Sequence, residues 1–390
     1  MTPLDTPAPQ PDTGDDAACF TLSNAMLVLP DRVLEGGLRI EHGRIAGLTR
    51  SPGRDMGGAF LLPGLVDIHT DHVEKHVFPR STVRWDMLNA FLAHDAQVIG
   101  SGITTVFDSL PVGAAQHRPE RREILADLVA ALEEGRALGL FRAEHLLHLR
   151  CEVTDPATPA LAASVIDRAQ IVSVMDHTPG DRQVTDIADW VTGMARDLQI
   201  TLERSRELTD ALLERSAREG GRVRAEVVAL ARAHGLPMLS HDDASPAHVA
   251  MAVAEGVAVS EFPTTRAAAE AARAAGLAIV AGAPNYLRGG SQSGNVAVRE
   301  LLEAGLVDIL ASDYVPRALI DAAFAIAADP ALPQGLPETV RMVSEAPARA
   351  AGLTDRGRLE PGLRADLLHV ARTRGRTHLR AAWRAGRRVA

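Results

Sequence analysis

The 390-residue sequence contains little cysteine and almost no lysine. Its two cysteines, Cys19 in the N-terminal tail and Cys151 in an apolar segment, exclude a disulfide framework and suit a reducing compartment. Lys75 is the single lysine, so 40 of the 41 basic residues are arginines. The net charge of −9 provides no bulk positive field, and we therefore expect neither nucleic acid nor an anionic membrane as a partner.

Long apolar runs are also missing. No segment approaches the roughly 20 apolar residues of a membrane span. Residues 1–18, rich in Pro, Thr and Asp, lack the regions of a secretory signal, which predicts a disordered tail and a cytoplasmic protein. The hydrophobic fraction of 46% is ample for one large domain with a small satellite.

The two ends of the chain share the pattern of short β-strands. Apolar residues alternate between Phe20 and Leu62, separated by Gly, Asn and His-Gly turns, and the pattern returns in ADLLHVAR and LRAAWRAGRRV near the C-terminus. We therefore expect residues 19–62 and 354–390 to form one small β-sandwich domain, with residues 63–353 as the catalytic domain.

The long middle region alternates apolar runs with helical segments. Eight runs are typical of buried strands: LVDIH, ITTVFDSL, LLHLRCEV, IVSVMDH, PMLSHDD, VAVSEFP, LAIVAGAPN and VDILASD. Between them, Ser245-Pro246 marks the start of a helix and Gly256 its end. This alternation predicts an α/β protein with a (β/α)8 TIM barrel, and residues 178–233 predict extra helices between strands four and five.

Ionisable side chains gather at the C-terminal ends of these strands, where barrel enzymes carry their chemistry. A lone histidine or aspartate there is more often a helix cap or a loop hydrogen-bonder. Their recurrence on several strands instead predicts a pocket for one or two divalent metal ions, such as Zn, Mn or Fe. The predicted ligands are His69, Asp71, Glu152, His177, His241 and Asp313.

A glycine-rich segment, Leu287–Asn295, follows strand seven and precedes a predicted helix. Glycines let backbone N–H groups approach an anion, and many barrels bind phosphate after strands seven and eight. A plain flexible loop is the alternative, but the location and Arg288 favour phosphate. The candidate substrate-binding residues are Lys75, Arg80, Arg150, Arg182, Arg288, Ser291 and Asn295, any of which could instead pair with an acid at the surface or rim.

Several of these segments resemble a known family. LLPGLVDIHTD, the GITTV strand, a later strand-end histidine and the final SD are similar to the amidohydrolase superfamily. Eight further segments resemble its PhnM-like branch, which belongs to the carbon–phosphorus lyase pathway. They are HTDHVEKHVFPR, AHDAQVIGSGITTVFDSLPVG, AEHLLHLRCE, MDHTPGDRQ, SHDDASPAHV, EFPTT, GAPNYLRGGSQSGNV and ILASDY. The resemblance implies hydrolysis of α-D-ribose 1-methylphosphonate 5-triphosphate to the 5-phosphate and pyrophosphate.

The sequence departs from the superfamily's common metal pattern at three positions. Asp71 replaces the second histidine of His-x-His, as in the PhnM-like branch. No lysine lies on a barrel strand to serve as a carboxylated bridge, which makes Glu152 the best substitute. Glu261 stands where strand six usually carries a histidine. Whether one or two ions bind, and whether Glu261 or His177 completes the shell, is left open.

The resemblance implies a metal-activated water that attacks the α-phosphorus. Asp313 would orient or deprotonate this water as the catalytic residue, and arginines would neutralise the leaving pyrophosphate. A C–N hydrolase (an amidase or deaminase) on the same scaffold is the alternative enzyme, because fold alone does not separate the two. A non-catalytic scaffold subunit of the phosphonate pathway is the alternative outside enzymes. The alkyl group of the phosphorylated ribose-phosphonate substrate and a homo-oligomeric state are left open.

Overall fold

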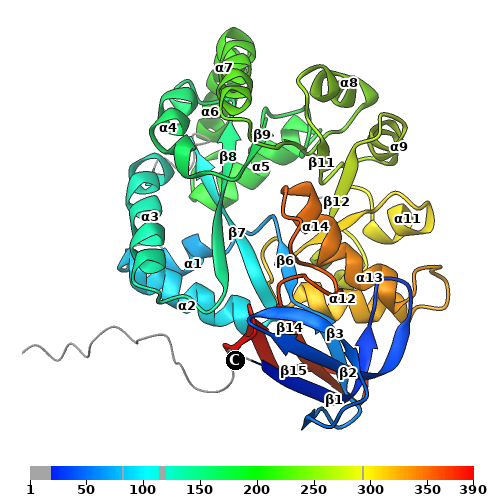
Figure 1. The fold of residues 1–390 in the computed structure, drawn as a ribbon. Coiled ribbons are helices and arrows are strands. Elements are labelled where there is room, and N and C mark those ends of the chain that lie inside the picture. Colours follow the sequence, from blue (N-terminus) through cyan, green and yellow to red (C-terminus); the bar gives the residue numbers. More distant parts are fainter. Residues whose placement is uncertain (1–18, 81–82, 114–119, 292–293) are drawn as a thin grey trace, which may run out of the picture.

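Two eight-stranded sheets organise the chain. Figure 1 shows a barrel surrounded by helices, with a second sheet below it. The computed structural model describes residues 19–80, 83–113, 120–291 and 294–390, so the predicted disordered tail lies outside the described residues. Among the described residues, no helix combines the length and apolar character needed to cross a bilayer.

One sheet is the predicted barrel, with eight parallel strands in chain order. They are β6 Leu65–Asp67, β7 Ile103–Val112, β8 Glu144–Glu152, β9 Ile171–Met175, β10 Met238–His241, β11 Val259–Glu261, β12 Ala278–Gly282 and β13 Ile309–Ala311. Each lies within or overlaps one of the eight predicted runs. An apolar cluster fills the interior with one side chain from nearly every strand: Val66, Phe107, Ile171, Leu239, Val259, Val280 and Ile309.

The barrel closes just beyond the ends of its first and last strands. The N–H of Asp71 donates to the carbonyl of Asp313 at 2.7 Å, and the N–H of Asp313 donates to the carbonyl of His69 at 3.2 Å. Because the seam runs through three predicted metal ligands, closing the barrel also brings these side chains together.

Helices surround the barrel. They are α1 Val73–Val77, α2 Met87–Gly100, α3 Glu120–Ala137, α4 Thr158–Val165 with the 3-10 turn Ile166–Arg168, α8 Pro246–Ala254, α9 Arg266–Ala274, α10 Ala283–Arg288, α11 Val298–Glu303, α12 Ala318–Ala327, α13 Leu336–Met342 and α14 Glu345–Ala350. At the start of α8, Ser245 caps the helix by accepting from the N–H of His248, as its sequence predicts.

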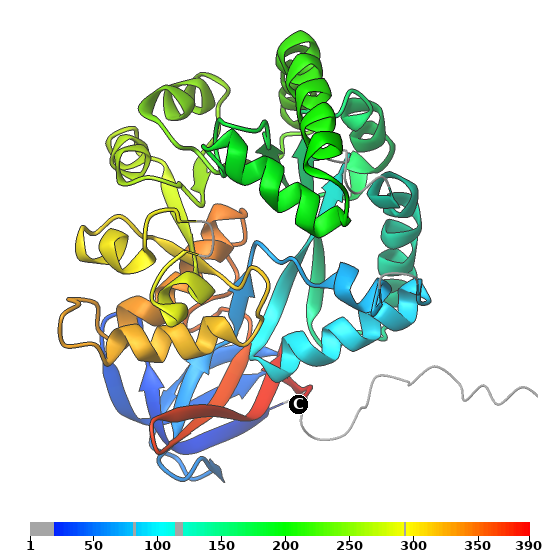
Figure 2. The same cartoon turned by 180° about the vertical axis from the view of Figure 1, so that it is seen from behind.

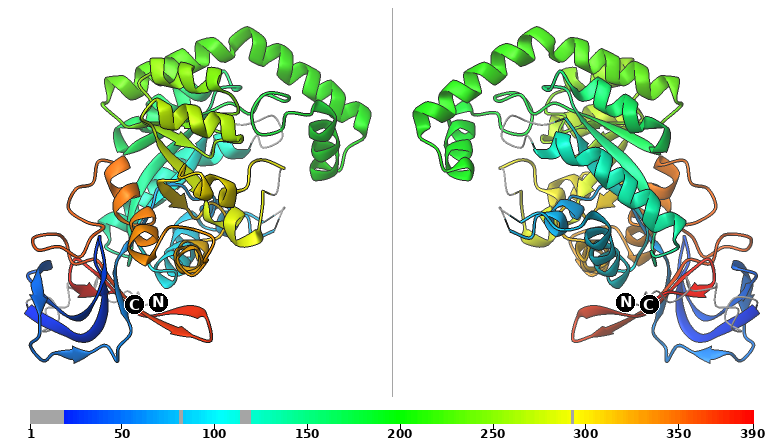
Figure 3. Two further views of the ribbon diagram at one scale, coloured as in Figure 1. Left: turned by 90° about the vertical axis from the view of Figure 1, so that its right-hand side faces the viewer. Right: turned by 90° about the vertical axis from the view of Figure 1, so that its left-hand side faces the viewer.

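The predicted extra helices lie between β9 and β10. They are α5 Ile187–Leu198, α6 Leu202–Arg215, the π-helical turn Ser216–Gly220 and α7 Gly221–Ala233. From α6 to α7 the chain forms one long arched helix, with α5 folded back at its far end (Figure 3).

The second sheet contains strands from both chain ends, which lie side by side in Figure 2. Its strands are β1 Cys19–Val28, β2 Val33–Glu41, β3 Arg44–Thr49, β4 Arg54–Asp55, β5 Phe60–Pro63, β14 Leu367–Thr373, β15 Arg376–Arg384 and β16 Arg387–Arg388. β5 joins the two ends, because it pairs with β1 on one side and β14 on the other. A separate small β domain built from both ends is thus confirmed; its exact boundaries stay a prediction.

The passage from one sheet to the other occurs at Gly64. A Cβ at this position would lie 2.1 Å from Oγ1 of Thr104 on β7. Only glycine therefore allows β5 and β6 to follow each other so closely against the barrel wall.

Trp383→Ala tests how the small domain is stabilised. Trp383 on β15 is 1% exposed in an apolar cluster shared by strands of both ends. We expect its truncation to lower the free energy of unfolding by about 3–5 kcal/mol, because it leaves a cavity. Denaturant unfolding measures the change, and Leu48→Ala on the exposed side of β3, where Leu48 is 48% exposed, is the control. Equal stabilities of the two variants would contradict a shared core.

Candidate active site

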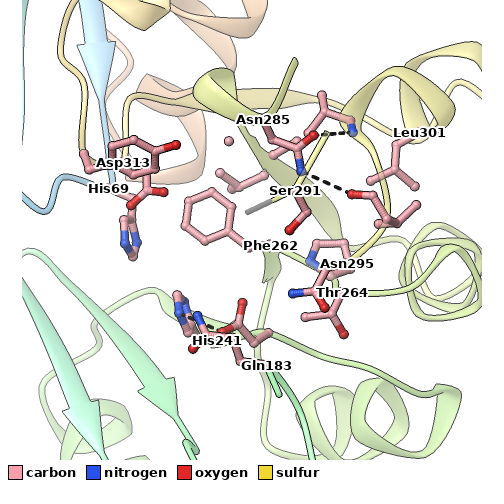
Figure 4. A pocket seen from close by; sticks show the side chains of 18 of the residues that line it. His69, Gln183, His241, Phe262, Thr264, Asn285, Ser291, Asn295, Leu301 and Asp313 are labelled. Carbon is pink, nitrogen blue, oxygen red and sulfur yellow. Dashed lines mark hydrogen bonds and ion pairs between the residues drawn. The ribbon is translucent and has the colours of Figure 1, made fainter. Parts of the chain in front are cut away.

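A pocket opens at the C-terminal ends of the barrel strands, and Figure 4 shows the side chains around it. It brings together four of the six predicted ligands and four of the seven predicted substrate residues. These eight are His69, Asp71, His241, Asp313, Arg150, Arg288, Ser291 and Asn295. Sequence reasoning did not single out several other lining residues: Gln183, Asp242, Phe262, Thr264, Asn285 and Tyr314.

Glu261, at the end of β11, links two predicted ligands. Its carboxylate accepts from Nδ1 of His69 and from Nδ1 of His241, both at 2.7 Å. Burial alone would raise the pKa of Glu261, but the two imidazoles outweigh burial and hold this pKa well below its ordinary value. Each ring uses Nδ1 for Glu261, so its Nε2 is the nitrogen left for an ion. Metal-ligating histidines are commonly oriented in this way by a carboxylate.

Two carboxylates face these imidazoles. Burial raises the pKa of Asp313; the charge of His69 opposes this, and the negative charge of Asp71 adds to it. Nη1 of Arg150 lies 3.4 Å from Oδ1 of Asp71, and this ion pair partly offsets the negative charge of the acids. A divalent cation would stabilise both carboxylates, and this donor set therefore fits a metal ion.

A second group of donors lies beside the first. Ligand atoms of His177, His241 and Asp242 all lie within 4.8 Å of one another. The buried Oδ2 of Asp242 faces Nε2 of His241 at 3.3 Å, yet among the described residues it accepts no hydrogen bond. An orphaned carboxylate oxygen among imidazoles again favours a cation. The only sequence signal for Asp242 was its place directly after the histidine of strand five.

The predicted bridge Glu152 lies outside the pocket lining and pairs with His177. Its Oε2 accepts from Nδ1 of His177 at 2.5 Å, and its Oε1 accepts from the hydroxyl of Thr154 at 2.7 Å. Burial would raise the pKa of Glu152, but His177 and Thr154 together lower it to about 2. Glu152 thus orients His177 much as Glu261 orients its two histidines.

Three residues within two positions of the ends of barrel strands adopt the left-handed backbone conformation. They are Asp242 with φ 56°, Phe262 with φ 56° and Asp313 with φ 52°. Each costs roughly 1–3 kcal/mol, and non-glycine residues persist in such conformations mainly at functional sites. Phe262 uses its position to pack edge-on against the ring of His69, with centroids 4.7 Å apart.

The glycine-rich segment after β12 differs from its prediction in two respects. Leu287 and Arg288 form the last turn of α10, so the irregular segment starts at Gly289, whose φ is 80°. The following helix, α11, has only six residues, and its dipole is therefore weaker than the sequence suggested. Arg288, Ser291 and Asn295 nevertheless line the pocket.

Three predicted substrate residues lie elsewhere. Arg182 is 1% exposed and donates to Oδ1 of Asp243 and to the carbonyl of His241, so it supports the end of β10 and is not available to a ligand. Arg80 is exposed between α1 and α2, outside the pocket lining. Lys75 is exposed on α1 and reaches the pocket rim only through Tyr314.

A second buried histidine cluster lies between α2 and the barrel wall. His145 donates from Nδ1 to Asp108 at 2.8 Å and from Nε2 to Asp95 at 3.3 Å, and His94 pairs with the other oxygen of Asp108 at 2.9 Å. Burial would lower the pKa of His145, but the two carboxylates raise it to about 9. Because both ring nitrogens are donors, His145 has no lone pair for a metal, and the cluster is an ion network.

Comparisons with known proteins agree with this architecture. The sequence profile of the amidohydrolase family matches residues 181–390. A solved amidohydrolase is 18% identical with a TM-score of 0.59, over 95% of this chain and 98% of the other. N-acetylglucosamine-6-phosphate deacetylase from Pasteurella multocida is 13% identical with a TM-score of 0.58, over 95% and 99%. At these identities the structures show a shared fold alone.

The chain belongs to the amidohydrolase family, and within it to the branch of a curated relative from Escherichia coli K12. This relative, named alpha-D-ribose 1-methylphosphonate 5-triphosphate diphosphatase, is 40% identical over 375 residues, which cover 94% of this chain and 99% of the relative. The family resemblance in the sequence is thereby confirmed.

We expect one or two divalent transition metal ions per chain, and fewer in His69→Ala, because the incomplete shell binds metal more weakly. Elemental analysis of the purified proteins gives the stoichiometry. His378→Ala, at an exposed position on β15, is the matched control and should keep the wild-type content. Fully active wild-type protein without stoichiometric metal would refute the site.

The buried ion network predicts a pH dependence of stability. The pKa of His145 is raised from 6.5 to about 9 on folding, so its contribution is fully present below pH 6.5 and is lost as the pH rises towards 9. Urea unfolding of the wild type should show that the free energy of unfolding declines between pH 6 and pH 9. In His145→Gln this decline should be smaller. An unchanged slope in His145→Gln would mean that the imidazolium is not the cause.

Proposed function

We propose that this enzyme hydrolyses a ribose 1-alkylphosphonate 5-triphosphate to the 5-phosphate and pyrophosphate, in phosphonate catabolism. The observation that carries the proposal is the combination of side chains that line one pocket. Imidazoles and carboxylates that suit a divalent ion share this pocket with Arg288, Ser291 and Asn295. The activity named for the Escherichia coli relative, which is 40% identical over almost the whole chain, supports the same function.

One or two ions, Zn, Mn or Fe, would be held by His69, Asp71, His241 and Asp313 of the pocket. Asp242 and His177 are the adjacent donors, and Glu261 and Glu152 orient the histidines from behind. When bound, the ion supplies Lewis-acid activation of water and offsets the charge of the phosphates.

Asp313 is the proposed catalytic base. Its raised pKa favours acceptance of a proton from the attacking water at the carboxylate. Arg150, whose buried Nε has no hydrogen-bond partner among the described residues, lies beside Asp71 and would neutralise charge at the phosphoryl group under attack. Arg288, which also lines the pocket, would stabilise the leaving pyrophosphate.

A C–N hydrolase is less well supported. Such activities need few cations in the pocket, whereas here both Arg150 and Arg288 line it. The assembled donor set also disfavours a non-catalytic scaffold role. A cytoplasmic location and a homo-oligomeric state stay predictions.

The deciding experiment is incubation of the metal-loaded protein with a ribose 1-methylphosphonate 5-triphosphate, followed by phosphorus NMR. Intact pyrophosphate and the 5-phosphate should appear together. Stepwise release of orthophosphate, or the absence of hydrolysis, would contradict the proposal.

Arg288→Ala should lower kcat/KM and turnover while leaving metal content unchanged. A guanidinium holds two phosphate oxygens at once, and its contact strengthens as charge develops on the leaving group. We expect a loss of about 2–4 kcal/mol of transition-state stabilisation, with partial recovery in Arg288→Lys. Steady-state kinetics measure it, and Arg266→Ala, an exposed arginine on α9 paired with Glu270, is the control. Wild-type kinetics in Arg288→Ala would show that Arg288 does not bind the substrate.

A further inference from the structure

Tyr314 brings together two cations from different parts of the barrel. It follows Asp313 directly after β13, and its side chain lines the pocket. Nη1 of Arg288, at the end of α10, donates to the Tyr314 hydroxyl at 3.1 Å. Nζ of Lys75, on α1, donates to the Tyr314 carbonyl at 3.3 Å and lies 5.5 Å from the centroid of its ring. Three separate segments thus meet at one side chain on the pocket rim.

The two cations lack the acidic partners that many arginines of this chain have. Arg150, Arg182 and Arg299, for example, each lie within 4 Å of a carboxylate. Among the residues that the structure describes, neither Lys75 nor Arg288 has a carboxylate at ion-pair distance. Two positive charges that contact one residue repel each other, and an anion that contacts both would offset this repulsion. Their arrangement therefore favours a ligand with several negative charges.

The identity of Lys75 adds a second observation. The chain uses arginine at 40 of its 41 basic positions, yet lysine stands at this one. An ammonium group is a compact charge with three donors, so it can lie over an aromatic face, donate to a carbonyl and still donate to a ligand. The planar fork of arginine does not offer the same combination at this distance.

We propose that Lys75 and Arg288, placed by Tyr314, form a clamp for the two terminal phosphates of the substrate, which leave as pyrophosphate. This inference rests on the proposed function. Because Tyr314 adjoins Asp313 in the chain, the clamp lies next to the proposed point of hydrolysis, and Lys75 and Arg288 would both bind the leaving group. Tyr314 is a positioning residue in this arrangement.

The single lysine makes a direct test feasible. An amine-acetylating reagent can modify only Lys75 and the chain's amino terminus, and mass spectrometry measures both rates in one sample. Inorganic pyrophosphate at ten times its dissociation constant should slow the acetylation of Lys75 about tenfold, since only the free form reacts. The amino terminus should react at an unchanged rate, and sulfate at equal ionic strength should give no such protection.

Variants of Tyr314 separate positioning from direct contact. Tyr314→Phe keeps the ring beside Lys75 but loses the hydroxyl that holds Arg288, whereas Tyr314→Leu loses both. We expect pyrophosphate to protect Lys75 less in Tyr314→Phe than in wild type and least in Tyr314→Leu. Lys75→Ala should raise KM for the triphosphate and lower kcat, with partial rescue in Lys75→Arg, while metal content stays unchanged.

The outcomes distinguish the clamp from the proposed function. If pyrophosphate protects Lys75 but no triphosphate is hydrolysed, the clamp stands and the proposed function fails. If the triphosphate is hydrolysed but Lys75 reacts equally fast with and without pyrophosphate, the clamp is wrong. Equal protection in wild type and Tyr314→Leu would likewise overturn the positioning role of Tyr314.

Discussion

The buried carboxylate of Glu261 is held between the imidazoles of His69 and His241, and the geometry of the pocket depends on this pairing. An ionised carboxylate with no exposed surface is costly unless it is paired and hydrogen-bonded. Here one side chain from β11 is satisfied by residues that follow β6 and end β10. The same contacts fix which ring nitrogens remain for a ligand. The contacts that pair these barrel strands' side chains therefore also orient the metal-donor candidates.

The pocket gathers positive charge although the chain as a whole is acidic. Carboxylates and imidazoles lie along the seam between β6 and β13 and at the end of β10, and Arg288 and Lys75 lie around Tyr314. A divalent ion among the carboxylates and a polyanion at the two cations would each offset local charge. Net charge alone does not reveal such an arrangement, because it averages over the whole surface.

Two clusters of similar composition have different chemistry in this protein. At the mouth, each of His69 and His241 gives only Nδ1 to Glu261. Behind the barrel wall, His145 gives both nitrogens to carboxylates. The number of ring nitrogens already in use decides between a site that can take a cation and a network that is complete without one. The presence of histidine and acidic residues alone therefore does not distinguish the two clusters.

The sequence by itself determined the eight buried strands, the β domain built from both chain ends, and the strand ends at which the candidate ligands lie. These features are local: period-two alternation, apolar runs and turn residues are read one segment at a time. It did not determine that Arg182 pairs with Asp243, that Glu152 serves His177, or that Leu287 and Arg288 end a helix. Nor did it indicate Asp242 as a donor or Tyr314 as the meeting point of two cations. Those outcomes depend on which side chains face each other across the closed barrel, and that follows from strand register, left-handed turns after the strands and the position of the seam. Only the tertiary structure decides them, because residues 20 to 240 positions apart in the chain become neighbours only once the barrel is closed.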